Sequence, residues 1–418
     1  MSALDTHTSS FQKEDLILNP SRTFFKNVYK TFANFSVKTI SVSPLTSNLS
    51  FGSSIEFRIP NNGDLITKMY LNITLPSVHN NIIVGNTYAN WVNSVGFALI
   101  NSVEFYVGGN LIDRHTGTFL DIWNELTDKN KTEWNMVGKF NEQSELQFLQ
   151  SNSTTYQIPL KFFFNRENGM ALPLFILGDE NIRIRIDINS LQNLILHDTA
   201  NAITDVNLDS ITLHVDTVKL SSEEKQLVND IIPKESLIIE TLQYNEDVQN
   251  SLSITLEHPV KEIIFAFRHN NRLSSNNPQI TINPTQLKGN DIFNYDAIST
   301  TNSNDYDTFN TLSITVGNAG NTITDQAFTF NHFKKEQKHK YHNNHSSNKN
   351  IYVYSFGLYP ETISPSGYYN FSRNTSDKLQ LNFTGTLANM QLSVYALSYE
   401  YLNVRLDSAN KSRIPFGD

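Results

Sequence analysis

The sequence predicts an all-β protein made of two β-sandwich domains. Short segments in which apolar and polar residues alternate recur along the whole chain, as in IRIRIDI at Ile182–Ile188. Clusters of Asn, Gly, Pro and Ser separate these segments, and the chain contains 52 Asn residues, which favour turns over long helices. A length of 418 residues is too long for one average domain and suits two.

Each alternating segment is expected to form a strand with one buried and one exposed face, as in antiparallel sheets. The segment at Ile182–Ile188 is the clearest case in the first half of the chain. The other expected strands carry the apolar series Ile55, Phe57, Ile59; Leu71, Ile73, Leu75; Val103, Phe105, Val107; Leu252, Ile254, Leu256; Leu312, Ile314, Val316; Leu379, Leu381, Phe383; and Met390, Leu392, Val394.

Helical spacing occurs in three places. One apolar stripe is formed by Phe119, Ile122, Trp123 and Leu126. A second possible helix follows Pro20 and carries Phe24, Phe25, Val28, Tyr29 and Phe32. A third begins at Ser221, which forms an S-x-x-E capping box with Glu224, and ends near Pro233. Because strands lie on both sides of it, this third helix is predicted to connect the two domains.

Composition and charge exclude several classes of protein. The net charge is −9 and no basic block is present, so direct binding of nucleic acid is not expected. The absence of Cys excludes disulfides, thiolate zinc sites and Cys nucleophiles, and fits maturation in a reducing compartment. The N-terminal residues lack the pattern of a secretory signal, and no apolar run is long enough to span a bilayer.

No sequence motif indicates catalysis. The chain lacks the P-loop, dinucleotide-binding, zinc-protease and nucleophile-elbow patterns, so we expect no catalytic residue, cofactor or metal, and no enzymatic activity. The one suggestive stretch is HFKKEQKHKYHNNH at 332–345, in which His339, His342 and His345 are three residues apart. Its low apolar content favours a mobile, solvated loop over a metal site. We expect residues 339–350 to lie, with the Asn-rich stretches 270–277 and 302–310, among the outer loops.

Seven segments, in order, resemble the major capsid proteins of the nucleocytoplasmic large DNA viruses, a family that includes iridoviruses and phycodnaviruses. They are NPSRTFFKNVYKTFANFSVKTI from Asn19, NNGDLIT from Asn61, SVEFYVGGNLIDRHTG from Ser102, DIWNELT from Asp121, IPLKFFFNRENGMALPLFIL from Ile158, HPVKEIIFAF from His258 and IYVYSFGLYPETISPSGYYNFSR from Ile351. The matching segments run from Asn19 to Arg373, with continuation to about Arg405.

The resemblance implies two tandem eight-stranded antiparallel jelly rolls, a double jelly roll, with a few short helices. The corresponding division is an N-terminal arm at 1–20, a first jelly roll at 21–218, a connector helix at 219–236, a second jelly roll at 237–410 and a C-terminal tail at 411–418. It also implies that residues 19–40 lie toward the capsid interior, where the cluster of Phe24, Phe25, Tyr29 and Phe32 braces the base of the capsomer. An alternative place for that cluster is the core of the domain.

The residues that carry the resemblance are expected to fix loop geometry or to form interfaces. They are Asn19, Pro20, Thr23, Phe24, Phe25, Lys26, Tyr29, Asn34, Phe35, Gly63, Asp64, Gly108, Gly109, Asp113, His115, Trp123, Phe163, Phe164, Asn165, Leu172, Pro173, Leu174, His258, Pro259, Pro365, Ser366, Gly367, Asn370, Phe371, Ser372 and Arg373.

The function that the resemblance implies is structural: homotrimers act as pseudo-hexameric capsomers of an icosahedral virion, assembled in the host cytoplasm. The expected partners are two further copies of the chain, neighbouring capsomers, minor capsid and penton proteins, and an internal membrane contacted indirectly. Asn374 and Thr375 replace the family's usual residues, which leaves a divergent minor capsid paralogue as an alternative. A β-sandwich carbohydrate-binding or adhesion protein and a β-sandwich glycoside hydrolase are further alternatives.

Overall fold

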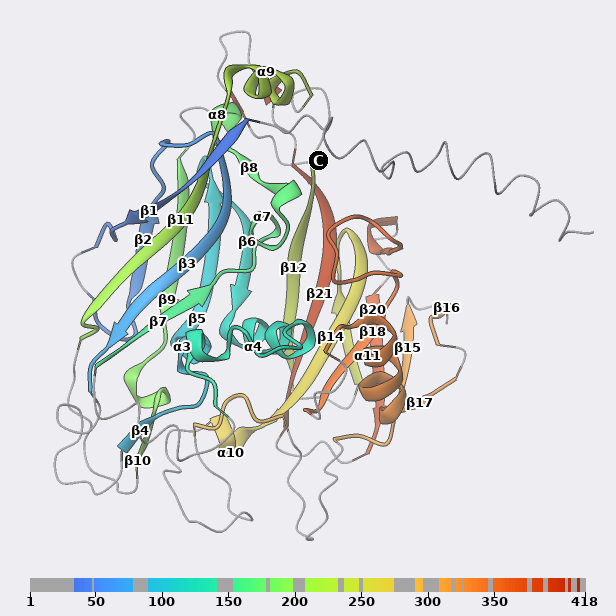
Figure 1. Ribbon diagram of the computed structural model, residues 1–418. Coiled ribbons are helices and arrows are strands. Elements are labelled where there is room, and N and C mark those ends of the chain that lie inside the picture. Colours follow the sequence, from blue (N-terminus) through green and yellow to red (C-terminus); the bar gives the residue numbers. More distant parts are fainter. Residues whose placement is uncertain are drawn as a thin grey trace, which may run out of the picture.

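The structure is a computed structural model in which two sets of β-sheets lie side by side (Figure 1). Strands β1 to β11 form the first half of the molecule and strands β12 to β21 form the second. The residues that the structure describes are 34–46, 49–77, 89–140, 153–177, 181–197, 207–231, 237–247, 251–273, 290–295, 308–316, 321–324, 326–344, 349–373, 378–385, 390–402, 405–406 and 412–413.

The first half contains two facing antiparallel sheets. One has the order β1-β11-β3-β7, with β8 pairing with β3, and the other has the order β2-β9-β5-β6. The bounds are β1 Phe35–Val42, β2 Ser54–Arg58, β3 Leu65–Leu75, β5 Ile100–Val107, β6 Asn110–Thr116, β7 Thr154–Pro159, β8 Leu172–Pro173, β9 Ile182–Ile188 and β11 Ser210–Leu220. A small ribbon joins β4 Ala89–Trp91 to β10 Ile195–His197.

The second half repeats this strand order. Its sheets run β12-β21-β14-β18, with β19 pairing with β14, and β13-β20-β15-β16, with β17 pairing with β15. The bounds are β12 Leu237–Asp247, β13 Ser251–Thr255, β14 Pro259–His269, β15 Thr311–Val316, β16 Asn321–Thr322, β17 Phe328–Thr329, β18 Ile351–Ser355, β19 Tyr369–Asn370, β20 Lys378–Thr384 and β21 Met390–Leu402; β22 Arg405–Leu406 and β23 Ser412–Arg413 pair with each other.

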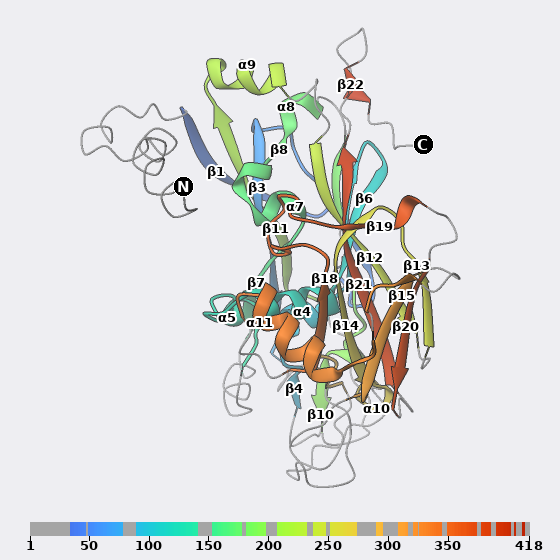
Figure 2. The ribbon, with the colours of Figure 1, turned by 90° about the vertical axis from the view of Figure 1, so that its right-hand side faces the viewer.

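The two halves therefore have one topology. Numbered within either half, the principal strands follow the orders 1-8-3-6 and 2-7-4-5, which is the pattern of a jelly roll. Figure 2 shows the sheets of the second half from the side. The double jelly roll predicted from the sequence is confirmed, and the strands expected from alternation are present in both halves.

Short helices cover the ends and edges of the sheets. Two of the three predicted helices are present: α4 Gly117–Thr127, and α9 Ser222–Ile231, whose Glu224 N–H donates to Ser221 Oγ over 3.3 Å. The helix predicted between Phe24 and Phe32 lies outside the described residues. The remaining helices are α3 Val95–Leu99, α5 Trp134–Val137, α7 Phe163–Arg166, α8 Leu174–Leu177, α10 Asn270–Leu273, a π-helical turn at His332–Glu336, α11 Gln337–Tyr341, and 3-10 turns at Asn168–Met170, Leu191–Asn193 and Phe371–Arg373.

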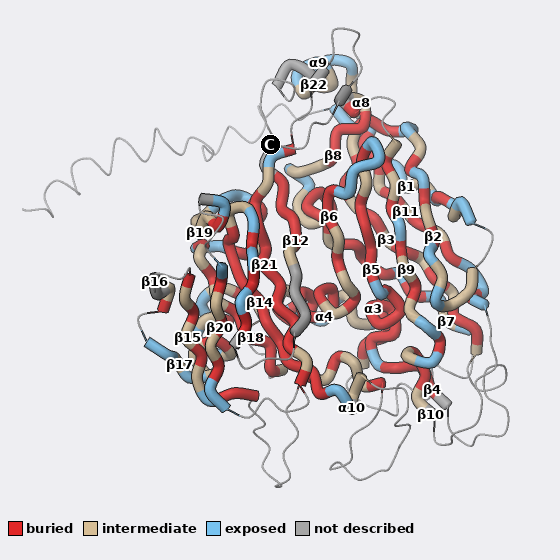
Figure 3. Tube along the Cα trace, turned by 180° about the vertical axis from the view of Figure 1, so that it is seen from behind, coloured by how far each residue is buried: buried red, intermediate tan, exposed pale blue. Residues whose placement is uncertain are grey.

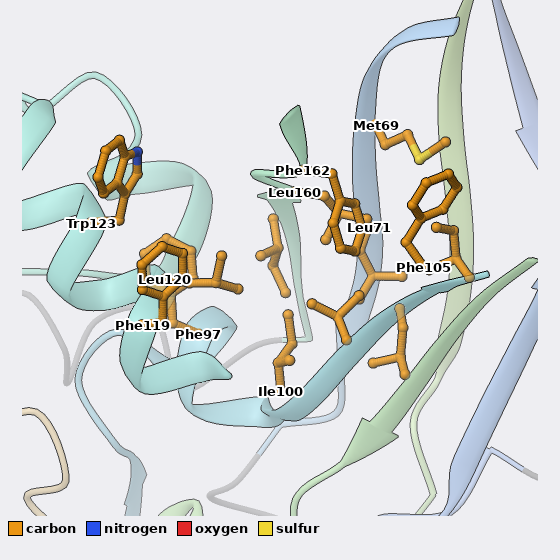
Figure 4. Packing of buried hydrophobic residues seen from close by; sticks show 14 of the residues in the cluster. Met69, Leu71, Phe97, Ile100, Phe105, Phe119, Leu120, Trp123, Leu160 and Phe162 are labelled. Carbon is orange, nitrogen blue, oxygen red and sulfur yellow. The ribbon is translucent and has the colours of Figure 1, made fainter. Parts of the chain in front are cut away.

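The apolar core continues from the first half into the second. The alternating side chains of β14 point to two different clusters: Phe265 faces the core of the second half, whereas Ile264 and Ala266 join the cluster of the first. Buried residues accordingly line the strands in both halves (Figure 3). Helix α4 lies at the junction and carries Phe119 and Trp123, which belong to the same apolar cluster as Phe97 (Figure 4). In the described ranges, no helix has the length and apolar character needed to cross a membrane.

Candidate functional site: the buried charged seam

Charged side chains from both halves meet along the junction of the two jelly rolls, which we call the charged seam. Helix α4 supplies its first-half side. Thr116 caps this helix, since its hydroxyl accepts a hydrogen bond from the N–H of Phe119 over 3.2 Å. The face that carries Phe119 and Trp123 packs into the core, and Asp121 and Glu125, one turn apart, are buried with it.

The first cluster of the seam joins α4 to the second half. Lys139 Nζ lies 2.8 Å from Asp121 Oδ1 and 2.7 Å from Glu125 Oε1. Lys349, from the second half, lies 2.9 Å from Glu125 Oε1 and 3.5 Å from Asp121 Oδ2. The hydroxyl of Tyr295, also from the second half, donates to Asp121 Oδ2 over 2.9 Å. Two carboxylates thus face two ammonium groups and a phenol.

The ionisation of this cluster follows from its partners. Burial alone raises the pKa of Glu125, but the charges of Lys349 and Lys139 outweigh burial and lower that pKa to about 2. Burial and then the neighbouring Asp121 raise the pKa of Tyr295 well above its usual value, so its hydroxyl stays protonated as a donor. Glu125 therefore remains charged and paired at neutral pH.

The second cluster centres on Glu240 of β12. This buried carboxylate pairs with Arg166 of α7, in the first half, and with Lys261 of β14. The Arg166 guanidinium also lies 4.3 Å from the centre of the Trp123 ring. Burial raises the pKa of Glu240, but Arg166 and Lys261 lower it below the usual value overall. Burial lowers the pKa of Lys261, with Glu240 opposing that effect.

The third cluster surrounds His342, which follows α11. Its Nε2 lies 2.7 Å from Glu262 Oε1 and its Nδ1 lies 3.2 Å from Glu361 Oε1. Burial lowers the pKa of His342, but the two carboxylates outweigh burial and raise it to about 9. The imidazolium form therefore donates to both carboxylates at neutral pH.

The expectation of a mobile, solvated loop at 332–345 is wrong. The segment is helical from His332 to Tyr341, and Phe333 and Lys338 are fully buried. The π-helical turn brings Phe333 against the Phe265 ring, with centroids 5.9 Å apart, so one aromatic anchor compensates for the low apolar content. His339 is exposed whereas His342 is buried, and His345 lies outside the described residues.

The same segment docks on the first half. The N–H of Asn344 donates to Leu126 O over 3.0 Å, and its side-chain amide donates to Glu125 O over 2.8 Å. Among the other expected outer loops, Thr308 and Phe309 are buried as well. The sequence pattern missed these positions because polar residues that bury at a junction look the same as polar residues on a surface.

The seam is suited to fixing orientation. Two of its ion pairs cross between the halves, Arg166 with Glu240 and Lys349 with Glu125, whereas His342 pairs with Glu262 and Glu361 inside the second half. Buried pairs of this kind depend strongly on geometry. Within the described part of the chain, no group of three or more His, Asp or Glu side chains is arranged to hold a metal ion.

Two protein-family models together match nearly the whole chain. A model described as the major capsid protein N-terminus matches residues 23–223, and one described as the large eukaryotic DNA virus major capsid protein matches residues 224–409. The chain belongs to this major capsid protein family.

Individual relatives agree with the family assignment. The chain is 30% identical to the major capsid protein of Pyramimonas orientalis virus, over 94% of this chain and 95% of the relative. It is 32% identical to capsid protein 1 of Acanthamoeba polyphaga mimivirus over 60% of this chain, and that match spans 46% of the mimivirus protein. Among structures, the PBCV-1 virus capsid model gives a TM-score of 0.75 at 20% identity, covering 95% of this chain and 100% of the other. The Faustovirus major capsid protein gives a TM-score of 0.70 at 13% identity, covering 91% and 92%.

Two signature residues of the family attach other elements to the sheets. Asp64, 2% exposed, accepts hydrogen bonds from the N–H of Leu220 over 2.9 Å and from Lys225 of α9 over 2.7 Å, tying α9 to β3. Asp113 accepts from the N–H of Leu242 over 3.0 Å, a bond that joins β6 to β12 of the other half. Trp123 also lies at the seam, beneath Arg166.

Other signature residues fix turns. Gly108 and Gly109 have φ values of 58° and 91° and form the β5–β6 hairpin turn. Gly367 has φ 135°, and a Cβ there would lie 2.9 Å from Phe356 O. Pro365 and Ser366 belong to the same loop, whose Ser366 Oγ accepts from the N–H of Tyr359 over 2.9 Å. His258 has a φ of 65° and precedes β14.

The remaining described signature residues pack or pair within the sheets. His115 stacks on Phe162, and Phe163 and Phe164 pack on Phe105. The side chain of Asn165 donates to Thr67 O over 3.0 Å. Backbone pairings join Leu172 and Pro173 to β3, and Pro259 to Asn370. Gly63 and Leu174 flank Asp64, and Phe371 is buried. Ser372 and Arg373 lie in a 3-10 turn, and Asn34 and Phe35 are exposed at the start of β1. Asn19, Pro20, Thr23, Phe24, Phe25, Lys26 and Tyr29 lie outside the described residues.

Sequence reasoning missed most of the charged seam. Glu240, Lys261, Glu262 and Lys349 carry it, and none was singled out. A signal was present in PVKEIIFAFRH, where a Lys-Glu pair interrupts an otherwise apolar strand. A charged pair inside a strand buried on both faces requires buried partners.

Proposed function

We propose that this chain is a structural building block of an icosahedral capsid, acting as a homotrimer that occupies a pseudo-hexagonal position. The observation that carries the proposal is the repetition of one jelly-roll topology in two halves joined by a buried seam. Three copies with two similar domains each present six similar units, which suits a hexagonal lattice. Membership of the major capsid protein family supports this role over that of a secreted adhesion protein.

The division of the chain is part of the proposal. We take residues 21–218 and 237–410 as the two jelly rolls and residues 219–236 as the connector, which contains α9. The segments 1–20 and 411–418 are then an N-terminal arm and a C-terminal tail. The matched family models change over within the connector, between residues 223 and 224, which supports this division.

A structural building block of a capsid requires extensive contacts between subunits. Each subunit is expected to bury well over about 2,000 Å² in an obligate trimer, with smaller and more polar contacts between trimers. Large apolar side chains that remain exposed on the single chain favour such contacts, among them Phe35, Val37, Tyr359, Tyr368 and Tyr401. The signature residues are proposed to set loops and contacts of this assembly, with no catalytic role.

Further partners complete the proposal. Neighbouring trimers, minor capsid proteins and penton proteins would contact the capsomer, an internal membrane would be reached indirectly, and nucleic acid would not be bound directly. The virion is the proposed location, with assembly in the host cytoplasm. The net charge of −9 supports the absence of direct nucleic-acid contact.

The solution mass of the purified chain tests the central claim. Three times 47.6 kDa is about 143 kDa, and light scattering after gel filtration should give that mass and keep it on dilution. A trimer should also show hexagonal outlines by negative stain. A stable monomer near 47.6 kDa in the presence of the minor capsid proteins would contradict the proposal.

A further inference from the structure

A cavity of about 290 Å³ lies between the two halves, beside the charged seam. Its first-half wall comes from α3, the start of β5, the junction of β6 with α4, and the turn after β9, and its second-half wall comes from the end of β14, α10 and residues 292–293. A volume of this size holds several waters at about 30 Å³ each and approaches the lower end of small-molecule sites.

The polar lining of the cavity carries positive charge. Arg114 and Arg268 line it together with Asn101, Asn189 and Thr118, and none of its lining residues, all of which belong to the described part of the chain, is Asp or Glu. This composition is unusual for the junction, because elsewhere along the seam carboxylates and cations face each other.

Arg268 is held rigidly at this position. It is 7% exposed, and its guanidinium donates to Thr118 Oγ1 over 3.0 Å, to Ser393 Oγ over 3.1 Å and to Gln391 Oε1 over 3.3 Å. The bond to Thr118 joins the two halves across the cavity, since Thr118 lies in the first turn of α4 and Arg268 lies near the end of β14. Ser393 and Gln391 belong to β21, in the same half as Arg268. A guanidinium keeps its positive charge at neutral pH, and the three oxygens that hold this one are neutral.

The first-half wall of the cavity, opposite Arg268, is more exposed to solvent. Arg114 has a side chain that is 40% exposed, with its Nε 3.4 Å from Glu104 Oε1, and Asn101 is exposed. Asn193 donates to Asn189 Oδ1 over 3.1 Å, and Asn189 donates to Ala98 O over 3.3 Å, so the amides are ordered. An incoming group can therefore reach the cavity from solution along the side of Asn101.

We propose that this cavity binds an oxyanion, a phosphate or sulfate group, free or carried on a small molecule. Guanidinium groups match the geometry of such anions, and amide and hydroxyl donors can complete their hydrogen bonds. Because both halves line the cavity, a bound anion would strengthen the junction in addition to filling the site. Its effect on stability would rise with its concentration, since a ligand that binds only the folded state stabilises that state by mass action.

Titration of the full-length chain with inorganic phosphate tests the proposal. Isothermal titration calorimetry at constant ionic strength should show saturable binding of one phosphate per chain, and the thermal unfolding temperature should rise over the same concentration range. Sodium chloride at matched ionic strength should produce neither effect. Sodium sulfate, and glucose 6-phosphate against glucose, then distinguish a free anion from an esterified one.

Two charge variants make the test specific. Asn101→Asp adds a negative charge at the exposed side of the cavity and should weaken phosphate binding at least tenfold. Asn62→Asp adds the same charge at an exposed position outside the lining and should leave binding unchanged. Arg268→Gln should abolish binding; if this variant does not fold, the Asn101→Asp comparison still decides. No saturable binding to the parent chain, or an equal loss in both Asn variants, would overturn the proposal.

Discussion

Lys349 of the second jelly roll lies 2.9 Å from the carboxylate of Glu125 in the first. Glu125 also pairs with Lys139 at 2.7 Å, so one carboxylate contacts a cation from each half. The contact helps to fix how α4 sits against the second half, because the side chain of Glu125 is only 6% exposed and that of its other partner, Lys139, only 3%. The relative orientation of the two halves is therefore determined in part by charge.

Replacing Glu125 with Gln tests this role. The change keeps the shape of the side chain but leaves Lys139 and Lys349 with Asp121 alone, and we expect a loss of about 3 kcal/mol in the free energy of unfolding. Urea unfolding followed by Trp fluorescence measures it. The pKa of Glu125 is lowered to about 2 in the folded chain. The contribution of Glu125 to the free energy of unfolding is therefore fully present above the unfolded pKa of Glu125, near 4.5, and is lost as the pH falls toward 2.

Glu56→Gln is the matched control for that experiment. Glu56 pairs with Arg183 at 3.0 Å, but the two side chains are 31% and 30% exposed. Solvent screens this pair, so its loss should cost less than about 1 kcal/mol. Equal losses in the two variants would show that the seam contributes no more than an ordinary surface ion pair.

The stability of the second jelly roll should fall as the pH rises from 6.5 to 8. The pKa of His342 is raised to about 9, so its stabilising contribution is complete below pH 6.5 and is lost as the pH rises through 9. Lys338 acts in the opposite direction. Burial, and then Lys334, lower its pKa to about 8, so the cost of burying its charge is relieved only above that pH.

The urea midpoint at pH 6, 7 and 8 measures this dependence. His342→Gln should remove most of the fall, which for the parent chain is at most roughly 3 kcal/mol over the full titration. His339→Gln, at an exposed position two residues into the same helix, should retain the fall. A parent chain whose midpoint does not change between pH 6 and 8 would disprove the assignment to His342.

Gly117 is expected to tolerate no side chain. A Cβ at this position would lie 2.1 Å from Phe97 O and 2.4 Å from Ile100 O, and both are backbone atoms that cannot move aside. Gly117→Ala should push α4 away from α3 and reduce the free energy of unfolding by at least about 2 kcal/mol. Gly169→Ala is the control, since nothing lies within 4 Å of a Cβ there. Thermal unfolding of the two variants should differ clearly, and similar midpoints would contradict this packing.

The sequence predicted the strands well because alternation of apolar and polar residues follows directly from a half-buried sheet. Ile182–Ile188 became β9, and the stripe from Phe119 to Leu126 became α4. The capping box at Ser221 correctly marked the start of α9. These features depend on neighbours in the sequence, which is why the sequence is enough to find them.

The charged seam could not be found in this way. Glu125 and Lys349 are brought together only by the tertiary fold, and neither residue is unusual in its local sequence. The stretch at 332–345 was misread for the same reason, since the partners that bury His342 are Glu262 and Glu361, far along the chain. Local composition reports polarity, whereas burial of a polar group depends on partners that the fold supplies.

Phe25→Ala tests the proposed role of the N-terminal aromatic cluster. If this cluster braces the base of the capsomer, the isolated variant should unfold at the same temperature as the parent chain but assemble into fewer shells. Thermal unfolding and particle counts by electron microscopy measure the two effects separately. Normal shells together with an unfolded fraction of monomer would place Phe25 in the core of the domain instead.

Phe35 and Val37 on the edge strand β1 should act in assembly. Their side chains are 59% and 58% exposed, and among the described residues β1 pairs with β11 alone, so this part of the chain leaves apolar surface and an open sheet edge in water. Serine at either position removes little buried surface from the chain, and the free energy of unfolding should change by less than about 0.5 kcal/mol. If the strand is covered by another subunit, each variant should weaken assembly about tenfold or more, as loss of an apolar anchor does at interfaces.

Light scattering across a dilution series measures this, with Leu111→Ser, at a 44% exposed position in β6, as the control. Unchanged assembly in Phe35→Ser and Val37→Ser would exclude β1 from the subunit contacts, because an interface that covers this strand must bury these side chains.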